Sequence, residues 1–585
     1  MDNREVAALL EEIGDLMEIL NENSFKVQSY RRAAESIRGL SEDLSAIRET
    51  DGLESIPHIG KSIATKLNQL LDTGRMEYHE QLKAQVPPGL LEMLRIPGVG
   101  PKKAALVWRE RGIGSVDELE AAAGGGQLRD LPGMGAKSEE RILHAIGVYR
   151  QGTQRALLSD LLPVAERIVA ALKELPEVID AAYAGSARRM KETVGDLDIL
   201  ATSTAPAAVT EAFKRRPEIR EIILSGDTKT SALLEGGRQV DLRVVPPESY
   251  GAALVYFTGS KEHNINIRER ARRMGLTINE YAVSRLLADD QEGERVAGAT
   301  EEEVYRTIGL PWMPPEIRED RGEIEAAEAG KLPVLLELDD IRGDLQMHSE
   351  WSDGTHPIEK MAATARAMGY EYVALTDHSV SLMVAHGLSP EKLAARREEI
   401  NELNAGFEQA GEGFRVLAGS EVDIKSDGSL DYAPEVLATL DIVLASIHQG
   451  FTDDKARMTD RILKALATGQ VDILCHPTGR VLLGRPGYPV DMEALVEAAI
   501  EFDVALEVNA FPDRLDLADT NVRLAMERGA RLTINTDAHS PAHLQYMRYG
   551  VATARRGWAT KEAVINTWTL RKLVKWREDR RKKAK

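Results

Sequence analysis

The 585-residue sequence lacks features that would place it outside the cell or in a membrane. It has one cysteine, Cys475, so no intrachain disulfide can form, and a reducing cytoplasm is the expected location. It contains no run of about 18 apolar residues, so we expect no membrane segment and no membrane partner. The opening MDNREVAALLEE is acidic and amphipathic and lacks the apolar core of a signal peptide.

The chain also lacks an excess of positive charge, since its formal net charge is −20. Non-specific DNA binding depends mainly on Lys and Arg, so this charge alone argues against a nucleic-acid partner. The argument fails if charge is segregated, because a metal site is itself acidic and backbone amides can also contact DNA. The basic end of the chain, residues 571–585, is interpreted as a solvated terminus in preference to a DNA contact.

Three aspartates form the first chemically informative group. Asp196 and Asp198 lie two apart in an apolar run, and in a strand such residues point to the same face. Asp241 lies in QVDLRVV, which alternates like a half-buried strand. Two strands with three acids can hold two divalent cations about 4 Å apart, the arrangement for in-line nucleotidyl transfer. A lone D-x-D is more often surface charge.

A phosphate-binding phrase precedes these acids. Gly185 and Ser186 offer a close backbone approach and a hydroxyl, and Arg188 and Arg189 offer guanidinium groups. The whole phrase, G-S-x-R-R followed by G-D-x-D, resembles the palm signature of family X DNA polymerases, the group that contains polymerase beta. The resemblance implies that the three aspartates hold two Mg²⁺ or Mn²⁺ ions. It also implies nucleotide-binding roles for Gly185, Ser186, Arg189 and Gly195.

Three similar phrases recur near the N-terminus: IPHIGKS from 56, IPGVGPK from 96 and LPGMGAK from 131. Each predicts a glycine turn that aims backbone N–H groups and a helix N-terminus at an anion. They resemble the helix-hairpin-helix, which grips DNA phosphates without reading sequence; alone, each could also be a glycine-capped helical hairpin. His58 replaces the first glycine of the first copy, which puts that turn in doubt. The DNA-binding candidates are Gly60, Gly98, Gly100, Gly133 and Gly135.

The first segment also resembles the lyase domain of polymerase beta. Lys66 falls on the Schiff-base lysine of that domain, and Tyr30 and Lys26 match residues of its pocket. A desolvated lysine can lose its proton and become a nucleophile. A helical lysine is more often a solvated charge, and Ser62 replaces a lysine that helps to bind the 5′-phosphate, so the lyase stays an open alternative.

The phrase YFTGS resembles the nucleotide-binding subdomain of the same polymerases. The match implies that Tyr256, Phe257 and Gly259 lie against the incoming nucleotide, that Asn264 meets the base edge and that Arg268 contacts the template. On residues alone, a basic helix of this kind is usually solvated.

The second half places His, Asp and Glu after successive short apolar runs. This pattern predicts a β/α barrel whose strand ends supply ligands to one site. Imidazole and bridging carboxylate suit Zn²⁺ or Mn²⁺ in multinuclear centres. The candidate ligands are His348, Asp353, His378, Glu421, His448, His476, Asp537 and His539.

These motifs resemble a PHP (polymerase and histidinol phosphatase) domain, a distorted β/α barrel with a phosphoesterase site for up to three Mn²⁺ or Zn²⁺ ions. Gln346 stands where that family has a histidine, so we expect one weakened metal position. Asp377 either supports the ligands or caps a turn, and Arg480 is a candidate for a substrate phosphate. Cys475 is interpreted as a small buried thiol in preference to a ligand.

The predicted fold is multidomain, α+β and α/β. The expected domains are a lyase-like helix-hairpin-helix domain (1–90), helix-hairpin-helix fingers (91–150), a nucleotidyltransferase palm (151–247), a thumb-like domain (248–316), a linker (317–337) and a PHP domain (338–585). We expect a monomeric DNA polymerase that fills short gaps in DNA repair, using dNTPs and gapped or primer-template DNA, with a 3′–5′ exonuclease. The alternatives are a PHP domain that is only a scaffold, or a non-polymerase nucleotidyltransferase fused to a phosphatase.

Overall fold

The computed structural model describes residues 3–38, 44–50, 52–56, 58–94, 96, 98–153, 155–287 and 291–583. For a few helical residues (3–5, 35, 38, 45–46, 50, 144, 148 and 150–153) only the backbone is described. The chain divides into two compact units, Met1–Gln154 with Leu483–Arg485 and Arg155–Leu482 with Pro486–Lys585.

The first unit is helical, because apolar residues recur at three- and four-residue spacing and line one shared core. Its elements are α1 (Asn3–Ile19), α2 (Ser24–Arg38), α3 (Leu44–Thr50), α4 (Lys61–Thr73), α5 (Glu77–Lys83), α6 (Pro88–Met93), α7 (Pro101–Arg111), α8 (Val116–Gly124) and α9 (Ala136–Thr153), with a short 3₁₀ turn, η1, at Leu53–Ser55.

The three repeated phrases form three equivalent turns. Gly98 and Gly133 have φ of 82° and 74°, and His58 adopts the same left-handed conformation with φ of 64°. In each copy a backbone N–H closes the turn on the carbonyl three residues earlier, from Ile59, Val99 and Met134. The histidine therefore keeps the turn that glycine was expected to provide, at a conformational cost of about 1 kcal/mol.

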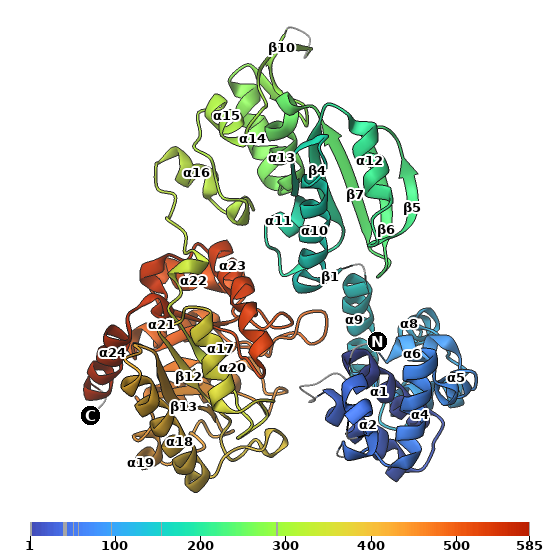
Figure 1. The fold of residues 1–585 in the computed structure, drawn as a ribbon, viewed down its shortest axis with the longest axis vertical. Helices are drawn as coiled ribbons and strands as arrows, with labels where there is room; N and C mark the ends of the chain where they lie inside the picture. Colours follow the sequence, from blue (N-terminus) through green and yellow to red (C-terminus); the bar gives the residue numbers. More distant parts are fainter. Residues whose placement is uncertain are drawn as a thin grey trace. The chain divides into compact units, whose positions relative to one another are not determined.

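A five-stranded sheet forms the palm, in the order β2-β4-β7-β6-β5. Strands β4 and β7 are parallel, and every other pairing in the sheet is antiparallel. Helices α10 (Leu158–Lys173) and α12 (Pro206–Lys214) pack on it (Figure 1). The strands are β2 (Val178–Tyr183), β4 (Leu197–Ser203), β5 (Ile219–Ser225), β6 (Lys229–Leu234) and β7 (Gln239–Val245), with a short β1–β3 pair (Ala156–Leu157 and Thr193–Val194) beside them.

The thumb-like region follows the palm and is built around buried ion pairs. Glu301 accepts hydrogen bonds from Arg318 at 2.7 Å and from Arg188 of the palm at 2.8 Å. Arg318 is fully buried, although it falls in the stretch interpreted as a linker. The elements are α13 (Tyr250–Thr258), α14 (Lys261–Arg273), β8 (Leu276–Ile278), β9 (Val283–Leu286), β10 (Glu292–Ala297), α15 (Glu301–Thr307) and α16 (Glu323–Glu328).

The expected β/α barrel is confirmed in the C-terminal half. Seven parallel strands follow chain order from β11 to β17, and a bridge between Met347 and Ala538 brings the first and last strands together. Helices surround the strands (Figure 1). The strands are β11 (Gly343–Met347), β12 (Tyr372–Leu375), β13 (Arg415–Asp423), β14 (Ile442–Ser446), β15 (Ile473–Leu474), β16 (Ala505–Asn509) and β17 (Leu532–Asn535). The main helices are α17 (Ile358–Ala367), α18 (Pro390–Gln409), α20 (Lys455–Ala467), α21 (Met492–Glu501), α22 (Asp519–Arg528) and α23 (Met547–Arg556).

The interpretation of the basic C-terminal stretch as a solvated terminus was wrong. Residues Leu570–Lys583 form helix α24, whose Leu573 and Trp576 are buried against the barrel. Arg580 donates from Nε to the buried carboxylate of Asp472 at 3.1 Å. The two apolar residues and this arginine share one helix face, and the many charges around them hid that pattern.

Palm and barrel share packing within the second unit. Leu515 and Tyr549 of the barrel region are buried in the palm core. Arg480 pairs with Glu192 of the palm at 2.8 Å, and Arg548 donates to Glu166 at 3.3 Å. Across the described residues, no helix is both long and apolar enough to cross a membrane.

Candidate functional sites

The palm acids lie on adjacent strands, as their spacing predicts. Asp198 on β4 stands directly opposite Asp241 on β7, and Asp196 lies just before β4. Burial, reinforced by the neighbouring charges of Asp196 and Asp241, raises the pKa of Asp198 to about 7. This repulsion is what a divalent cation with oxygen ligands would relieve, so the residues fit such an ion.

The three palm carboxylates are not drawn tightly together. Among the described residues, all groups of three or more ligand atoms within 4.8 Å of one another lie in the barrel. Asp241 instead accepts hydrogen bonds from Gln239 Nε2 at 3.1 and 3.2 Å.

The phosphate-binding phrase forms a short helix, α11 (Gly185–Arg188), beside the acids. Gly185 has φ of 59°, and a Cβ at this position would lie 2.4 Å from Asp198 Oδ2, so only glycine fits. Ser186 follows within α11, and Gly195 lies in the turn between β3 and β4. Arg189 donates from Nε to Glu319 at 2.9 Å and also to the Thr258 carbonyl, so its guanidinium is already partnered.

The YFTGS residues end helix α13 and begin helix α14. The rings of Tyr256 and Phe257 contact edge to face at 5.1 Å, and Arg243 lies 4.6 Å from the Phe257 ring centre. Gly259 adjoins the guanidinium of Arg189. Asn264 donates from Nδ2 to the Tyr256 carbonyl at 2.7 Å, while its buried Oδ1 has no partner among the described residues. Arg268 is exposed on α14.

The lyase candidates partly meet in the first unit. Lys66 Nζ lies 5.0 Å from the ring centre of Tyr78, which stacks on Tyr30 at 5.9 Å. Burial lowers the pKa of Lys66, in the direction a Schiff-base lysine requires. Lys26 is separate, since it is largely exposed and pairs with Glu22 at 3.7 Å.

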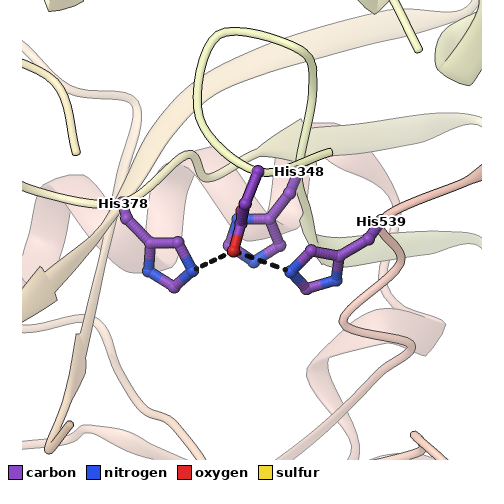
Figure 2. A group of neighbouring side chains, drawn as sticks. His348, His378 and His539 are labelled. Carbon is purple, nitrogen blue, oxygen red and sulfur yellow. Dashed lines mark ion pairs between the residues drawn. The ribbon is translucent and has the colours of Figure 1, made fainter. Parts of the chain in front are cut away.

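The barrel brings all eight predicted ligand positions to the carboxyl ends of its strands. Asp353 Oδ2 lies 3.4 Å from His378 Nε2 and 3.4 Å from His539 Nε2, and Oδ1 lies 3.7 Å from His348 Nδ1. Figure 2 shows the imidazole rings of His378 and His539 joined to one oxygen by dashed lines, with the His348 ring between them. These four residues form one group of atoms suited to a metal ion.

Glu421 links two further groups. Its carboxylate lies 3.0 Å from His476 Nε2 and 3.3 Å from His448 Nε2, and also contacts His348 and His378 at 3.4 and 3.6 Å. Burial raises the pKa of Glu421, but the imidazoles around it, His378 foremost, outweigh burial and hold the pKa well below its usual range. The two groups are His378–Glu421–His448 and His348–Glu421–Asp537.

The donor atoms of the barrel fit metal ions. Nδ1 of His476 and Oε1 of Gln346 are buried, and neither has a hydrogen-bond partner among the described residues, while Nε2 of the buried His348 lies 3.0 Å from Asp537 Oδ1. Buried polar atoms are normally hydrogen-bonded. Lone pairs that converge without donors are what a bound cation requires, so this region could hold metal.

Gln346 occupies the interior of this cluster. Its Nε2 donates to Glu421 Oε2 at 2.9 Å, and its Oε1 is one of the unpartnered atoms. The amide of Gln346 therefore occupies Oε2 of Glu421 with a hydrogen bond, and the atom that it can offer to a metal ion is its neutral Oε1. Imidazole is the better ligand for Zn²⁺ or Mn²⁺, which supports the expectation of a weakened position.

Sequence reasoning missed the residues that support the ligands. Asp423 Oδ1 contacts His448 Nδ1 at 2.6 Å, Glu507 accepts from the His476 backbone N–H at 2.7 Å, and Asn509 donates to Asp537 at 3.1 Å. The available signal was polar residues inside apolar strands, as in ALEVN. Asp377 accepts hydrogen bonds from Ser349, at 2.8 Å from its backbone N–H, and from Ser352 Oγ at 2.8 Å, so it holds the loop before Asp353.

Two further candidates are occupied elsewhere. Arg480, a candidate for a substrate phosphate, donates to Glu192 at 2.8 and 3.2 Å and to the Arg514 carbonyl at 3.0 Å. Cys475 is buried among apolar barrel residues, and burial raises the pKa of its thiol well above the usual range.

Family models match four segments of the chain. They are a helix-hairpin-helix domain at 1–76, a SAM-like helix-hairpin-helix tandem at 90–147, a DNA polymerase beta thumb at 253–319 and a PHP domain at 344–511.

The chain is similar to other proteins along all or part of its length. The chain is 40% identical over 573 residues to DNA polymerase/3′-5′ exonuclease PolX of Bacillus subtilis (strain 168), which covers 98% of each chain. It is 22% identical over 322 residues to rat DNA polymerase lambda, covering 51% of this chain and 53% of that one. It is 38% identical over 137 residues to a probable phosphatase of Shewanella sp. (strain ANA-3), covering 22% of this chain and 52% of that protein.

The chain combines helical hairpins, a palm with three aspartates, a polymerase beta thumb and a histidine-rich PHP barrel. These parts together define a family X DNA polymerase that has a PHP domain in addition to its polymerase core. With a relative 40% identical along 98% of the chain, the protein belongs to the PolX family.

Proposed function

We propose that the palm catalyses template-directed DNA synthesis at short gaps, adding dNTPs to a primer 3′-OH. The observation that carries this proposal is the register of Asp198 opposite Asp241, with Asp196 beside them on the same edge. Two Mg²⁺ or Mn²⁺ ions held by these carboxylates would supply Lewis-acid stabilisation of the phosphates.

The remaining residues of the palm and thumb bind and orient the substrate. Gly185 gives the Asp198 carboxylate its space, and Ser186 of α11 and the turn at Gly195 bind the triphosphate. The Tyr256–Phe257 pair supports the nucleotide sugar, with Phe257 held under Arg243. The free Oδ1 of Asn264 is suited to a base edge. Arg189 reaches the triphosphate by exchanging Glu319 for phosphate oxygens.

Primer extension tests this function. A 5′-labelled primer facing a short gap is incubated with dNTPs and Mg²⁺ or Mn²⁺ and resolved on a denaturing gel. The wild-type chain lengthens the primer, and Asp198→Asn does not, although both bind the gapped DNA equally. Extension by Asp198→Asn would reject the palm acids, and no extension by the wild type would leave the nucleotidyltransferase–phosphatase alternative.

We also propose that the barrel removes nucleotides from the 3′ end. Three overlapping groups of His, Asp and Glu support this. Mn²⁺ or Zn²⁺ bound there would supply Lewis-acid polarisation of the scissile phosphate. Asp423 orients His448, Asn509 orients Asp537, and Asp377 fixes the loop before Asp353. Hydrolysis of the terminal phosphodiester bond consumes one water, releases a nucleoside monophosphate and leaves a 3′-OH on the shortened strand.

The alternative is a barrel that serves only as a scaffold. Gln346 supports this alternative, because it replaces a histidine ligand by an amide. Incubation of the labelled primer without dNTPs, with Asp198→Asn and His476→Ala as matched variants, separates the two. A primer shortened by wild type and Asp198→Asn but not by His476→Ala supports the nuclease. An intact primer throughout, restored to shortening by Gln346→His, would show that the amide has disabled the site.

The helical unit contacts DNA through its three hairpin turns, and we propose that the protein acts as a monomer on gapped or primer-template DNA. Lys66 is proposed as a 5′-deoxyribose-phosphate lyase nucleophile on the strength of its partly desolvated place against Tyr78. Borohydride trapping of a labelled abasic 5′ end tests this role, and trapping that persists in Lys66→Ala would overturn it.

A further inference from the structure

The loop between β16 and α22 is held by several backbone hydrogen bonds. Its backbone closes on itself, because Arg514 and Leu515 both donate to the Phe511 carbonyl, at 2.9 and 3.1 Å. It is also tied to the end of β16, since Leu517 donates to the Glu507 carbonyl at 3.0 Å and Asn509 donates to the Asp516 carbonyl at 2.6 Å. The loop therefore holds the Cα of Arg514 at a fixed place beside the ligands.

The side chain of Arg514 lies beside the cluster of candidate metal ligands in the barrel, but it makes no hydrogen bond to another described residue. Its Nε lies 3.9 Å from Asp537 Oδ2, and the side chain is 27% exposed. No residue in the described part of the chain accepts a hydrogen bond from its guanidinium. A cation that is anchored by its backbone, lies beside a metal-ligand candidate and keeps its donors open is arranged to receive an anion from solvent.

The contrast with Arg480 is informative. Arg480 donates to both oxygens of Glu192 and to the carbonyls of Arg514 and Leu515. These four hydrogen bonds use most of the N–H groups of its guanidinium, and two of them hold the carbonyls of Arg514 and Leu515 in place.

The charge of the reaction explains why such a cation is needed. Asp353, Glu421 and Asp537 all face the centre, and a phosphodiester that approaches them is also an anion. A guanidinium presents paired N–H donors that match two phosphate oxygens. It also offsets the carboxylates at the rim, where the substrate enters.

We propose that Arg514 binds the phosphate of the substrate at the barrel centre, and that Arg480 positions the loop that carries it. The proposal rests on the nuclease function proposed above. It extends that function by naming the residue that recognises the phosphate group shared by the DNA end and the released nucleoside monophosphate.

The test uses the full-length chain loaded with Mn²⁺ and three variants: Arg514→Gln, Arg514→Lys and the matched control Arg528→Gln. Arg528 lies exposed on α22 of the same domain and pairs with Glu497 at 3.8 Å. Exonuclease KM and kcat are measured on a single-stranded oligonucleotide, and inorganic phosphate binding is measured by calorimetry. Metal content and melting temperature are recorded for each protein.

We expect Arg514→Gln to raise KM and the phosphate Kd about 10- to 100-fold, as for loss of a hydrogen bond to a charged group, with a smaller change in kcat. Arg514→Lys restores part of the phosphate affinity, and Arg528→Gln matches the wild type. Unchanged KM and phosphate Kd in Arg514→Gln would overturn the proposal. Loss of bound metal in that variant would also overturn it, since Arg514 would then act by holding Asp537.

Failure of the nuclease function is distinguishable from failure of this inference. If the wild-type chain degrades no DNA, the proposed nuclease function is rejected. The binding of inorganic phosphate then tests the Arg514 site by itself. Weaker phosphate binding by Arg514→Gln supports the site, and equal binding rejects it.

Discussion

The two candidate sites of this protein solve the problem of gathering carboxylates in opposite ways. The palm places three aspartates together with no histidine among them, and burial, reinforced by the charges of Asp196 and Asp241, raises the pKa of Asp198 to about 7. The barrel interleaves Asp353, Glu421 and Asp537 with five histidines, and the pKa of Glu421 is held low instead. The barrel therefore offsets its carboxylates with neighbouring imidazoles, whereas the palm gathers its carboxylates on two adjacent strands without them.

The largest expected effect is the loss of DNA synthesis when one palm carboxylate is removed. Asp198→Asn removes a central charge but keeps the shape, so we expect extension to fall at least about 1000-fold, equivalent to roughly 4 kcal/mol of transition-state stabilisation. The exonuclease rate should be unchanged. Single-turnover nucleotide addition and nuclease assays on the same preparation check both, and a parallel fall in the nuclease would contradict the separation of the sites.

The next largest effect concerns the ion pairs that join the palm to the thumb-like region through Glu301. Glu301→Gln leaves Arg188 and the fully buried Arg318 without their carboxylate, so we expect a loss of about 3 kcal/mol in the free energy of unfolding. Burial raises the pKa of Glu301, but Arg318 and Arg188 outweigh it and hold the pKa well below its ordinary value of 4.5.

The sign of the pH dependence follows from that lowered pKa. Glu301 contributes stability above about pH 4.5, and the contribution is lost as pH falls below this value. The difference in melting temperature between wild type and Glu301→Gln should therefore be largest near neutral pH and shrink in acid. A difference that grew in acid would contradict the assignment.

A smaller effect sharpens the comparison at the barrel. Asp423→Asn removes the carboxylate that orients His448, so we expect metal affinity to fall about 10- to 100-fold while DNA synthesis is retained. Chelator competition measures the affinity. Asp427→Asn is a matched control, because Asp427 is an exposed carboxylate that accepts hydrogen bonds from the neighbouring Ser429. Equal metal affinity in Asp423→Asn and wild type would show that the ring is oriented by other contacts.

The smallest effect lies outside both sites. His58→Gly relieves the left-handed conformation in the first hairpin turn, so we expect the helical unit to gain about 1 kcal/mol of stability. Metal content and nuclease activity should not change. Denaturant unfolding followed by circular dichroism measures the gain, and a destabilised variant would show that the imidazole makes a contact worth more than the strain.

Much of the fold and of both sites could be predicted because the chemistry is local in sequence. Alternation around Asp241 and the short apolar runs before His378, His448 and His476 locate strands and their ends, and parallel strands bring those ends to one edge. The turn at His58 could not be predicted, since a bulky residue at positive φ is the uncommon choice.

The supporting residues could not be found in the same way. Glu507 and Asn509 stand out as polar residues in the apolar strand ALEVN, but the strand pattern does not show that they contact His476 and Asp537. The partners of Arg480 and Arg514 depend on packing between segments far apart in sequence: Glu192 lies 288 positions before Arg480. Helix α24 escaped notice because Leu573 and Trp576 are outnumbered by charged neighbours.

The bond between Arg480 and Glu192 has a practical consequence for dissecting this enzyme. A fragment that began at the barrel would remove Glu192 and expose the apolar faces of Leu515 and Tyr549, which now lie in the palm core. The loop that carries Arg514 would lose its clamp on one side and its packing on the other. Rates measured on an excised barrel would then describe a different substrate entrance, and the polymerase half is better regarded as part of the nuclease scaffold than as a neighbour that can be cut away.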